Sequence, residues 1–183
     1  RGEAEDKRMI TLIRSLSDKP IYVDANQGWP TKEHALMMCQ WLAEQGVVMI
    51  EQPMPKHMNE EHAWLCERVD LPILADEACQ TYDDVERLAP YYDGINIKLM
   101  KCGGLAEGRK MITLARELGM QVMVGCMTET RAGISAATVL SPLVDYADLD
   151  GHVLIANDPY DGIQIIDGKL TLVNKPGTGV SPL

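Results

Sequence analysis

The sequence is short of basic residues and contains no long apolar run. Its 17 Lys and Arg are outnumbered by 27 Asp and Glu, which gives a net charge of −10. Nucleic acids and anionic membrane surfaces are bound by clusters of Lys and Arg, so this balance argues against both kinds of partner. No stretch approaches the roughly 18 consecutive apolar residues of a membrane-spanning helix, and we expect none.

The cysteines do not form pairs in the sequence. There are five, an odd number, and none lies in a CxxC motif. This pattern disfavours a disulfide framework and a structural zinc site, and we expect a reducing, cytoplasmic location. The chain also begins without an initiator Met or a signal peptide, directly within an amphipathic helical pattern at residues 1–16. We therefore expect that more of the polypeptide precedes it.

Short apolar runs alternate with longer stretches of helical periodicity. The runs predict strands at residues 21–24, 47–51, 73–76, 95–98, 122–126 and 146–150. The periodic stretches predict helices at residues 32–44, 60–69, 82–88, 105–118 and 131–140. Thr31 and Thr81 are expected as N-caps, and Gly46 and Gly119 as left-handed residues after helices. Strict alternation of strand and helix predicts parallel strands joined by right-handed crossovers.

Two architectures contain such strands: an open doubly wound sheet and a (β/α)₈ barrel of the TIM type. In an open sheet, functional residues gather at one switch point, whereas all strands of a barrel end at one mouth. Here nearly every predicted strand ends on a polar or charged residue. We therefore predict an α/β fold with six of the eight barrel units at residues 1–160, from the third strand onward. Residues 161–183 are predicted to form a tail with a hairpin around Asp167 and Gly168.

Three carboxylates end consecutive predicted strands: Asp24, Glu51 and Asp76. Carboxylates that converge from neighbouring strands suit a hard divalent cation such as Mg²⁺. Without a cation, their negative charges would raise one another's pKa. The alternative is that each is a helix N-cap or a loop carboxylate.

Lys98 lies on the side of its predicted strand opposite to two isoleucines, and so faces the barrel interior. A partly desolvated Lys beside a dication could act as a base, although an isolated Lys more often reaches out to solvent. We expect the latter for Lys101. Asp148 and Asp150 would project to the same side of the last strand, roughly 7 Å apart. Such a pair can bind an ammonium group, or one Asp can cap the turn at Gly151.

The sequence resembles the barrel domain of the enolase superfamily, and most of all its muconate-lactonizing subgroup. The resemblance rests on residues 23–29 (VDANQGW), 50–53 (IEQP), 75–77 (ADE) and 95–101 (INIKLMK). It covers the whole chain, with the motifs in the right order. Residues 148–150 (DLD), together with 127–130 (MTET), are similar to the dipeptide epimerases of that subgroup.

The resemblance implies a role for each matching residue. It implies that Asp24, Glu51 and Asp76 bind one Mg²⁺ ion and that Lys98 is an acid/base group. It further implies that Asp148 and Asp150 bind the α-ammonium of a dipeptide. Supporting positions beside the metal are Asn26 and Glu77. The family's second acid/base lysine and its N-terminal capping domain have no counterpart in this chain, and we expect both in the preceding part of the same polypeptide. The chain is compatible with a homo-oligomer.

The implied activity is Mg²⁺-dependent epimerisation of dipeptides by removal and return of an α-proton through an enediolate intermediate. One alternative is a cycloisomerase or an o-succinylbenzoate-synthase-type lyase of the same subgroup. The substrates of those enzymes lack an ammonium group, so Asp148 and Asp150 disfavour this reading. A second alternative is a non-catalytic metal-binding or assembly domain.

Overall fold

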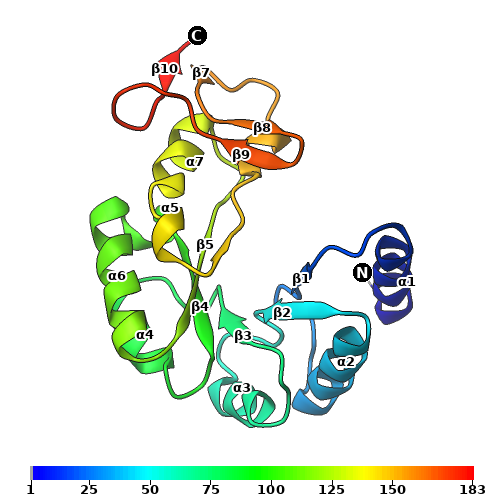
Figure 1. Ribbon diagram of the computed structural model, residues 1–183. Helices are drawn as coiled ribbons and strands as arrows, with labels where there is room; N and C mark the ends of the chain where they lie inside the picture. The colour runs from blue at the N-terminus through cyan, green and yellow to red at the C-terminus, as the bar shows by residue number, and fades with distance from the viewer. Residues whose placement is uncertain (1) are drawn as a thin grey trace. The chain divides into compact units, whose positions relative to one another are not determined.

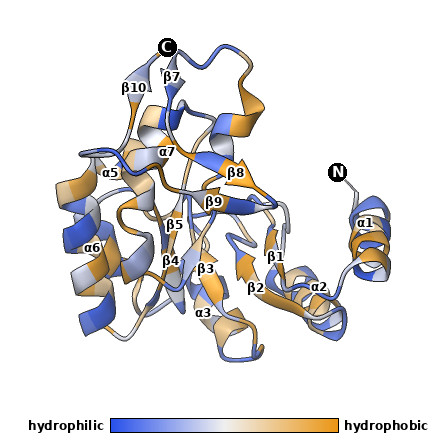
Figure 2. Ribbon diagram, turned by 45° about the horizontal axis from the view of Figure 1, so that its top comes forward, coloured by the Kyte–Doolittle hydropathy of each residue, from blue (hydrophilic) through white to orange (hydrophobic). Residues whose placement is uncertain are grey.

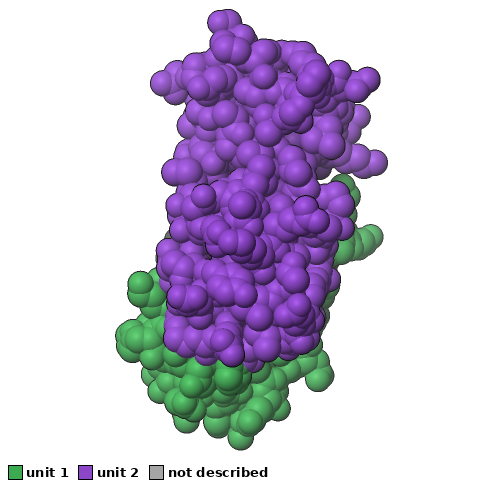
Figure 3. Space-filling model, turned by 90° about the vertical axis from the view of Figure 1, so that its left-hand side faces the viewer, with its two compact units in different colours: residues 1–75, 90–93 green, residues 76–89, 94–183 purple. Residues whose placement is uncertain are grey.

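The computed structural model describes residues 2–183, which form an α/β fold of short parallel strands and covering helices (Figure 1). The chain divides into two compact units, which Figure 3 shows in different colours. Unit 1 comprises Arg1–Ala75 and Pro90–Asp93, and unit 2 comprises Asp76–Ala89 and Gly94–Leu183. No helix within residues 2–183 is long and apolar enough to cross a membrane.

Unit 1 contains three parallel strands in the order β1-β2-β3. Its elements are α1 (Glu3–Leu16), β1 (Ile21–Asp24), α2 (Lys32–Glu44), β2 (Val47–Glu51), α3 (Asn59–Cys66) and β3 (Ile73–Ala75). The helix expected at residues 1–16 begins at Glu3, and Arg1 lies outside the described residues.

The core of unit 1 lies along its strands. Residues of β2 and β3 are almost all buried, and Figure 2 shows both strands in the apolar colour. Helix α2 packs against β2 and α3 and buries Met38, Cys39 and Leu42. Strands covered in this way are expected to be apolar throughout, so a charged residue at the end of one marks the point where the chain leaves the core.

Unit 2 contains a second set of parallel strands in the order β4-β5-β6. Its first elements are α4 (Tyr82–Leu88), β4 (Gly94–Lys98), α5 (Leu99–Cys102), α6 (Leu105–Glu117), β5 (Gln121–Gly125), α7 (Arg131–Thr138) and β6 (Tyr146–Ala147). They are joined or followed by η1 (Ser141–Leu143), η2 (Gly151–Leu154), β7 (Tyr160–Asp161), β8 (Gln164–Ile166), β9 (Lys169–Thr171) and β10 (Ser181–Pro182). Helix α6 packs on β4 and β5 and lies beside α4 (Figure 1).

The predicted capping residues are confirmed, although α3 and α7 end two to three residues earlier than predicted. Thr31 accepts a hydrogen bond from the His34 amide, and Thr81 forms a reciprocal capping box with Asp84. Gly46 and Gly119 both adopt φ of 74°, in the left-handed region where glycine is favoured after a helix.

The C-terminal part of the structure confirms one prediction from the sequence and contradicts another. The predicted hairpin is formed by antiparallel β8 and β9 around residues 167–168. The strand predicted at residues 146–150 is wrong in length, because β6 ends at Ala147. Asp150 has helical backbone angles and is the N-cap of the 3₁₀ helix η2, so the strand does not extend to residue 150. The division into a barrel portion at residues 1–160 and a tail at 161–183 stays a prediction.

Candidate active site

Two of the predicted metal ligands lie next to each other in unit 1. Asp24 is the last residue of β1 and Glu51 the last of β2, and the parallel register places them opposite one another. The Asp24 side chain is exposed, and its Oδ1 accepts the Asn26 amide at 2.8 Å. Glu51 is buried, with 4% of its surface exposed. The ends of parallel strands therefore bring these two carboxylates together, as the sequence predicted.

The loops that follow β1 and β2 are bonded to each other. The Gln27 amide donates to the Gln52 carbonyl at 2.7 Å, and the Lys56 amide donates to Gln27 Oε1 at 3.0 Å. Asn26, Gln27 and Gln52 have positive φ of 46°, 62° and 34°. Non-glycine residues adopt such angles at an energetic cost and often at functional sites. The backbone is thus held in a costly conformation within three residues after each of the two carboxylates.

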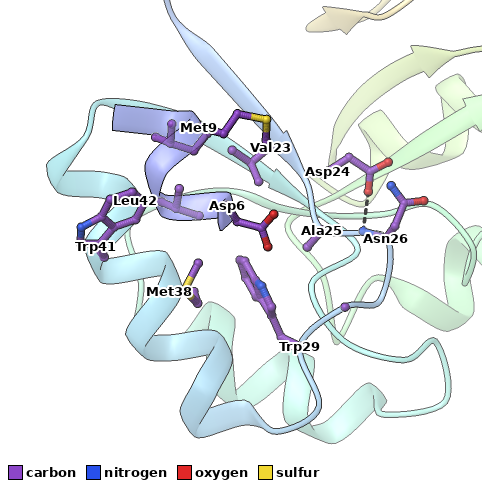
Figure 4. Close-up of a pocket in the computed structure, with 12 residues that line it drawn as sticks. Asp6, Met9, Val23, Asp24, Ala25, Asn26, Trp29, Met38, Trp41 and Leu42 are labelled. Atoms are coloured by element: carbon purple, nitrogen blue, oxygen red, sulfur yellow. Dashed lines mark hydrogen bonds between the residues drawn. The ribbon is translucent and has the colours of Figure 1, made fainter. Parts of the chain in front are cut away.

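Asp24 also borders a pocket of about 380 Å³ between α1, β1 and α2 (Figure 4). The Asp6 carboxylate and the Trp29 indole point into this pocket, which is otherwise lined largely by apolar side chains. The figure shows the Asp24 carboxylate turned toward Asn26 rather than into the pocket. The pocket therefore adds no polar partner to the candidate site.

The third predicted ligand, Asp76, lies in unit 2 and is paired with two lysines. Lys98 Nζ donates to Oδ2 at 2.7 Å and Lys101 Nζ donates to Oδ1 at 2.6 Å. The Asp76 and Lys101 side chains are each 7% exposed and that of Lys98 is 13% exposed. Burying these charges is tolerable because they compensate one another.

Lys101 is a residue that the sequence interpretation missed. We expected it to reach solvent, and this expectation is wrong. Its ammonium also donates to the Asp76 carbonyl at 2.7 Å and to the Asn96 carbonyl at 3.3 Å. The cause is α5, a single helical turn that begins directly after Lys98 and places residues 98 and 101 on one face.

The three carboxylates match the chemistry of a Mg²⁺ site, because this ion prefers hard oxygen ligands. In the structure, each Asp76 oxygen accepts a lysine ammonium group. Across residues 2–183, no group of three or more His, Cys, Asp or Glu is arranged to hold a metal ion. Asp24 and Glu51 belong to unit 1 and Asp76 to unit 2, so their grouping as one triad stays a prediction.

The two supporting residues of the prediction differ in environment. Asn26 is exposed and is bound through its amide to Asp24, as described above. Glu77 follows Asp76, and its Oε2 is buried without a hydrogen-bond partner in the structure. A buried carboxylate oxygen normally has a donor or a cation beside it, so Glu77 fits a position next to a cation site.

Asp148 and Asp150 flank the buried Leu149 just beyond β6. The pKa of Asp148 is raised above its ordinary value by partial loss of solvent and then by the Asp150 carboxylate, while the Lys98 ammonium opposes the rise. The two aspartates are therefore close enough to repel each other, and Lys98 acts on the nearer one. An ammonium ligand placed between them would relieve that repulsion.

His152, which follows Gly151 in η2, is 3% exposed. Burial and the Arg131 guanidinium lower its pKa. Asp158, which carried no sequence signal, is also buried, and it accepts the Arg131 amide at 2.7 Å at the start of α7. Both residues belong to the packing around α7.

Comparison with known proteins gives one consistent result. The model of the enolase C-terminal domain-like family matches residues 2–183. An L-Ala-D/L-Glu epimerase from Bacteroides thetaiotaomicron is 55% identical over 179 residues, which are 98% of this chain and 47% of that protein. The chain thus spans about half the length of the curated relatives it matches.

Two solved structures extend this result. A substrate-liganded L-Ala-D/L-Glu epimerase from Bacillus subtilis matches with a TM-score of 0.90 and 30% identity over 98% of this chain and 53% of that one. A dipeptide epimerase from Methylococcus capsulatus, complexed with Mg and the dipeptide L-Arg-D-Lys, matches with a TM-score of 0.87 and 32% identity over the same shares. The predicted fold class, an α/β barrel portion, is confirmed by these matches.

Proposed function

Because the chain belongs to the enolase C-terminal domain-like family, we propose that it is the barrel portion of a Mg²⁺-dependent dipeptide epimerase. One observation carries the proposal. The Lys98 ammonium contacts Asp76 and also acts electrostatically on Asp148. The candidate base thus contacts a candidate metal ligand and acts electrostatically on one of the two candidate ammonium-binding aspartates, which supports a substrate α-carbon bound next to Lys98.

We assign proton transfer on one face of the substrate to Lys98. In its neutral form, its Nζ would remove the α-proton, and in its ammonium form it would return a proton to the same face. Inversion requires a second acid/base group on the opposite face, which we place in the part of the polypeptide that precedes this chain. The capping domain expected there would enclose the substrate. The proposal is compatible with a homo-oligomer.

Asp24, Glu51 and Asp76 would hold the Mg²⁺ ion. The bound ion would stabilise the negative charge that develops on the substrate carboxylate as the α-proton leaves. Asn26 would orient Asp24 through its amide, and the buried oxygen of Glu77 would add negative potential beside Asp76.

Asp148 and Asp150 would bind the α-ammonium of the dipeptide. Each carboxylate can accept a charge-assisted hydrogen bond, and a cation between them would offset the repulsion that raises the pKa of Asp148. Dipeptides with a free amino group are therefore the proposed substrates. L-Ala-L-Glu is the first to test, because the relative from Bacteroides thetaiotaomicron is named for that pair.

The test is exchange of the glutamate α-proton with deuterated solvent. The complete polypeptide that carries this chain is incubated with L-Ala-L-Glu and Mg²⁺ in D₂O, and the α-proton signal is followed by NMR. We expect Mg²⁺-dependent loss of the signal together with formation of L-Ala-D-Glu. Lys110→Ala should leave this exchange unchanged, because Lys110 is an exposed lysine on α6 whose ion pair is with nearby Glu107. The absence of both exchange and epimerisation across a broad panel of dipeptides would contradict the proposal.

A further inference from the structure

The loop between β5 and α7 carries a glutamate whose side chain folds back onto the loop itself. Glu129 Oε1 accepts a hydrogen bond from the Met127 amide at 3.1 Å. The bond closes residues 127–129 into a compact turn just before α7 begins at Arg131. The glutamate thus has a defined conformation.

A glycine in the first turns of α7 makes room for this carboxylate. A Cβ atom at Gly133 would lie 1.9 Å from Glu129 Oε2 and 2.8 Å from its Cδ, which no real contact allows. Glycine is disfavoured within helices relative to alanine, and at position 133 it leaves the space that the end of the Glu129 side chain occupies, so that a Cβ there would displace the carboxylate. The carboxylate is therefore fixed at one oxygen by the Met127 amide and bounded at the other by the α7 backbone.

The other side of the loop touches the residue that follows Asp150. A Cβ atom at Gly151 would lie 2.1 Å from the Met127 carbonyl oxygen and 3.0 Å from Cys126 Sγ. The backbones of the loop and of the turn after Asp150 are thus in direct contact. Burial raises the pKa of the Cys126 thiol to about 11, and the carboxylates of Asp148, Asp150 and Glu129 add to the rise.

From these contacts we propose that Glu129 is a positioning residue for Asp148 and Asp150. Glu129 fixes the Met127 backbone, Met127 packs against Gly151, and Gly151 sets the backbone from which Asp150 projects. This inference rests on the proposed function, in which the two aspartates bind the substrate's α-ammonium. It assigns Glu129 an indirect role, without contact to substrate.

A different role for Glu129 would be direct attraction of the ammonium as a third carboxylate. The two roles are separated by Glu129→Gln and Glu129→Ala. Glutamine keeps an Oε1 that accepts the Met127 amide and loses the charge, whereas alanine loses both. A positioning role predicts that Glu129→Gln behaves much like wild type, and a charge role predicts that both variants are equally impaired.

Steady-state kinetics with a free-amine dipeptide, on the complete polypeptide, give the first readout. We expect Glu129→Ala and Gly133→Ala to raise KM about tenfold, the order expected when a single hydrogen bond that fixes a binding pair is lost, with kcat within about twofold of wild type. Glu117→Ala, at an exposed glutamate at the end of α6, is the matched control and should leave both parameters unchanged.

The double variant Glu129→Ala/Gly133→Ala gives a stricter test. The three atoms nearest to a Cβ at position 133 are Oε2, Cδ and Cγ of Glu129, and Glu129→Ala removes all three. Gly133→Ala should therefore lower the melting temperature of the wild type but leave that of Glu129→Ala unchanged or higher, because alanine favours helix. The KM of the double variant should equal that of Glu129→Ala alone.

Hydrogen exchange reports on the contact without catalysis. The Met127 amide should be protected in wild type and in Glu129→Gln, and should exchange faster in Glu129→Ala. If the wild type is active, three results would each overturn the positioning role. The first is an unchanged KM in Glu129→Ala, and the second is an equal rise of KM in Glu129→Gln and Glu129→Ala. The third is a double variant in which the effects of the two single substitutions on KM and melting temperature add up. An inactive wild type would instead overturn the proposed function.

Discussion

A buried histidine in unit 1 makes the stability of that unit depend on pH. His62, on α3, has no exposed surface. Its Nδ1 lies 2.6 Å from the Met58 carbonyl and its Nε2 accepts the Met54 amide at 3.4 Å, which is the pattern of a neutral ring. The ring also packs on Tyr92, with centroids 4.5 Å apart. A second proton would have to sit on Nε2, directly against the Met54 amide hydrogen.

The magnitude follows from the pKa of the ring. Burial lowers the pKa of His62 from 6.5 to about 4, and the Met58 carbonyl and Glu61 oppose this only in part. The unfolded chain takes up the proton near pH 6.5 and the folded chain only near pH 4. Between these values the unfolded state binds more protons, so the free energy of unfolding decreases as the pH falls. At 1.36 kcal/mol per unit, the loss reaches about 3 kcal/mol at pH 4 and is absent above pH 6.5.

Urea unfolding at pH 7 and pH 5 measures this loss. All three tryptophans of the chain, Trp29, Trp41 and Trp64, lie in unit 1, so tryptophan fluorescence of this chain follows the unit that contains His62. His62→Gln should show a clearly smaller decrease in unfolding free energy between the two pH values than wild type. His57→Gln, at an exposed histidine just before α3, should keep the wild-type decrease. Equal decreases in wild type and His62→Gln would refute the reasoning.

Three further predictions concern the proposed reaction. Glu51→Gln should weaken Mg²⁺ affinity at least about tenfold in calorimetric titration, because a neutral amide replaces a buried charged ligand, and Asp83→Asn on the exposed surface of α4 should not. Lys98→Ala should keep Mg²⁺ binding and remove exchange from one of the two substrate stereoisomers, whereas unchanged exchange from both would exclude Lys98 from the mechanism. An N-acetylated dipeptide should react with a kcat/KM about a hundredfold lower than that of the free amine. Asp150→Asn should raise KM for the free amine and reduce the difference in kcat/KM between the two substrates. Equal reaction of free and acetylated dipeptides would contradict the substrate class.

Much of the candidate site was predictable because it depends only on where parallel strands end. Asp24 and Glu51 are each the last residue of a short apolar run, and the observed register places them opposite one another. Lys98 likewise ends β4, and Asp76 follows β3 directly. Apolar runs with polar ends determine such positions, since a buried parallel strand tolerates charge only where it leaves the core.

The alternation of residues 146–150 was misleading for a physical reason. Tyr146, Asp148 and Asp150 alternate with Ala147 and Leu149, as in a half-buried strand. In the structure, Leu149 is buried although it lies outside regular secondary structure, and Asp150 is the N-cap of η2. Over five residues, a strand and an extended loop with one buried leucine give the same pattern, so periodicity alone does not locate the end of β6.

Lys101 was missed because its environment depends on one backbone change that polarity does not encode. Had β4 continued, residues 98 and 101 would have pointed to opposite faces, and solvent would have been the natural place for the second lysine. The chain instead turns into α5 at Leu99, and Gly103 with φ of 90° ends that turn. One helical turn carries Lys101 back to the Asp76 carboxylate and to two backbone carbonyls. The Gly103-Gly104 pair was the visible signal, because two glycines that adopt positive φ after a strand favour a turn over continuation of the strand.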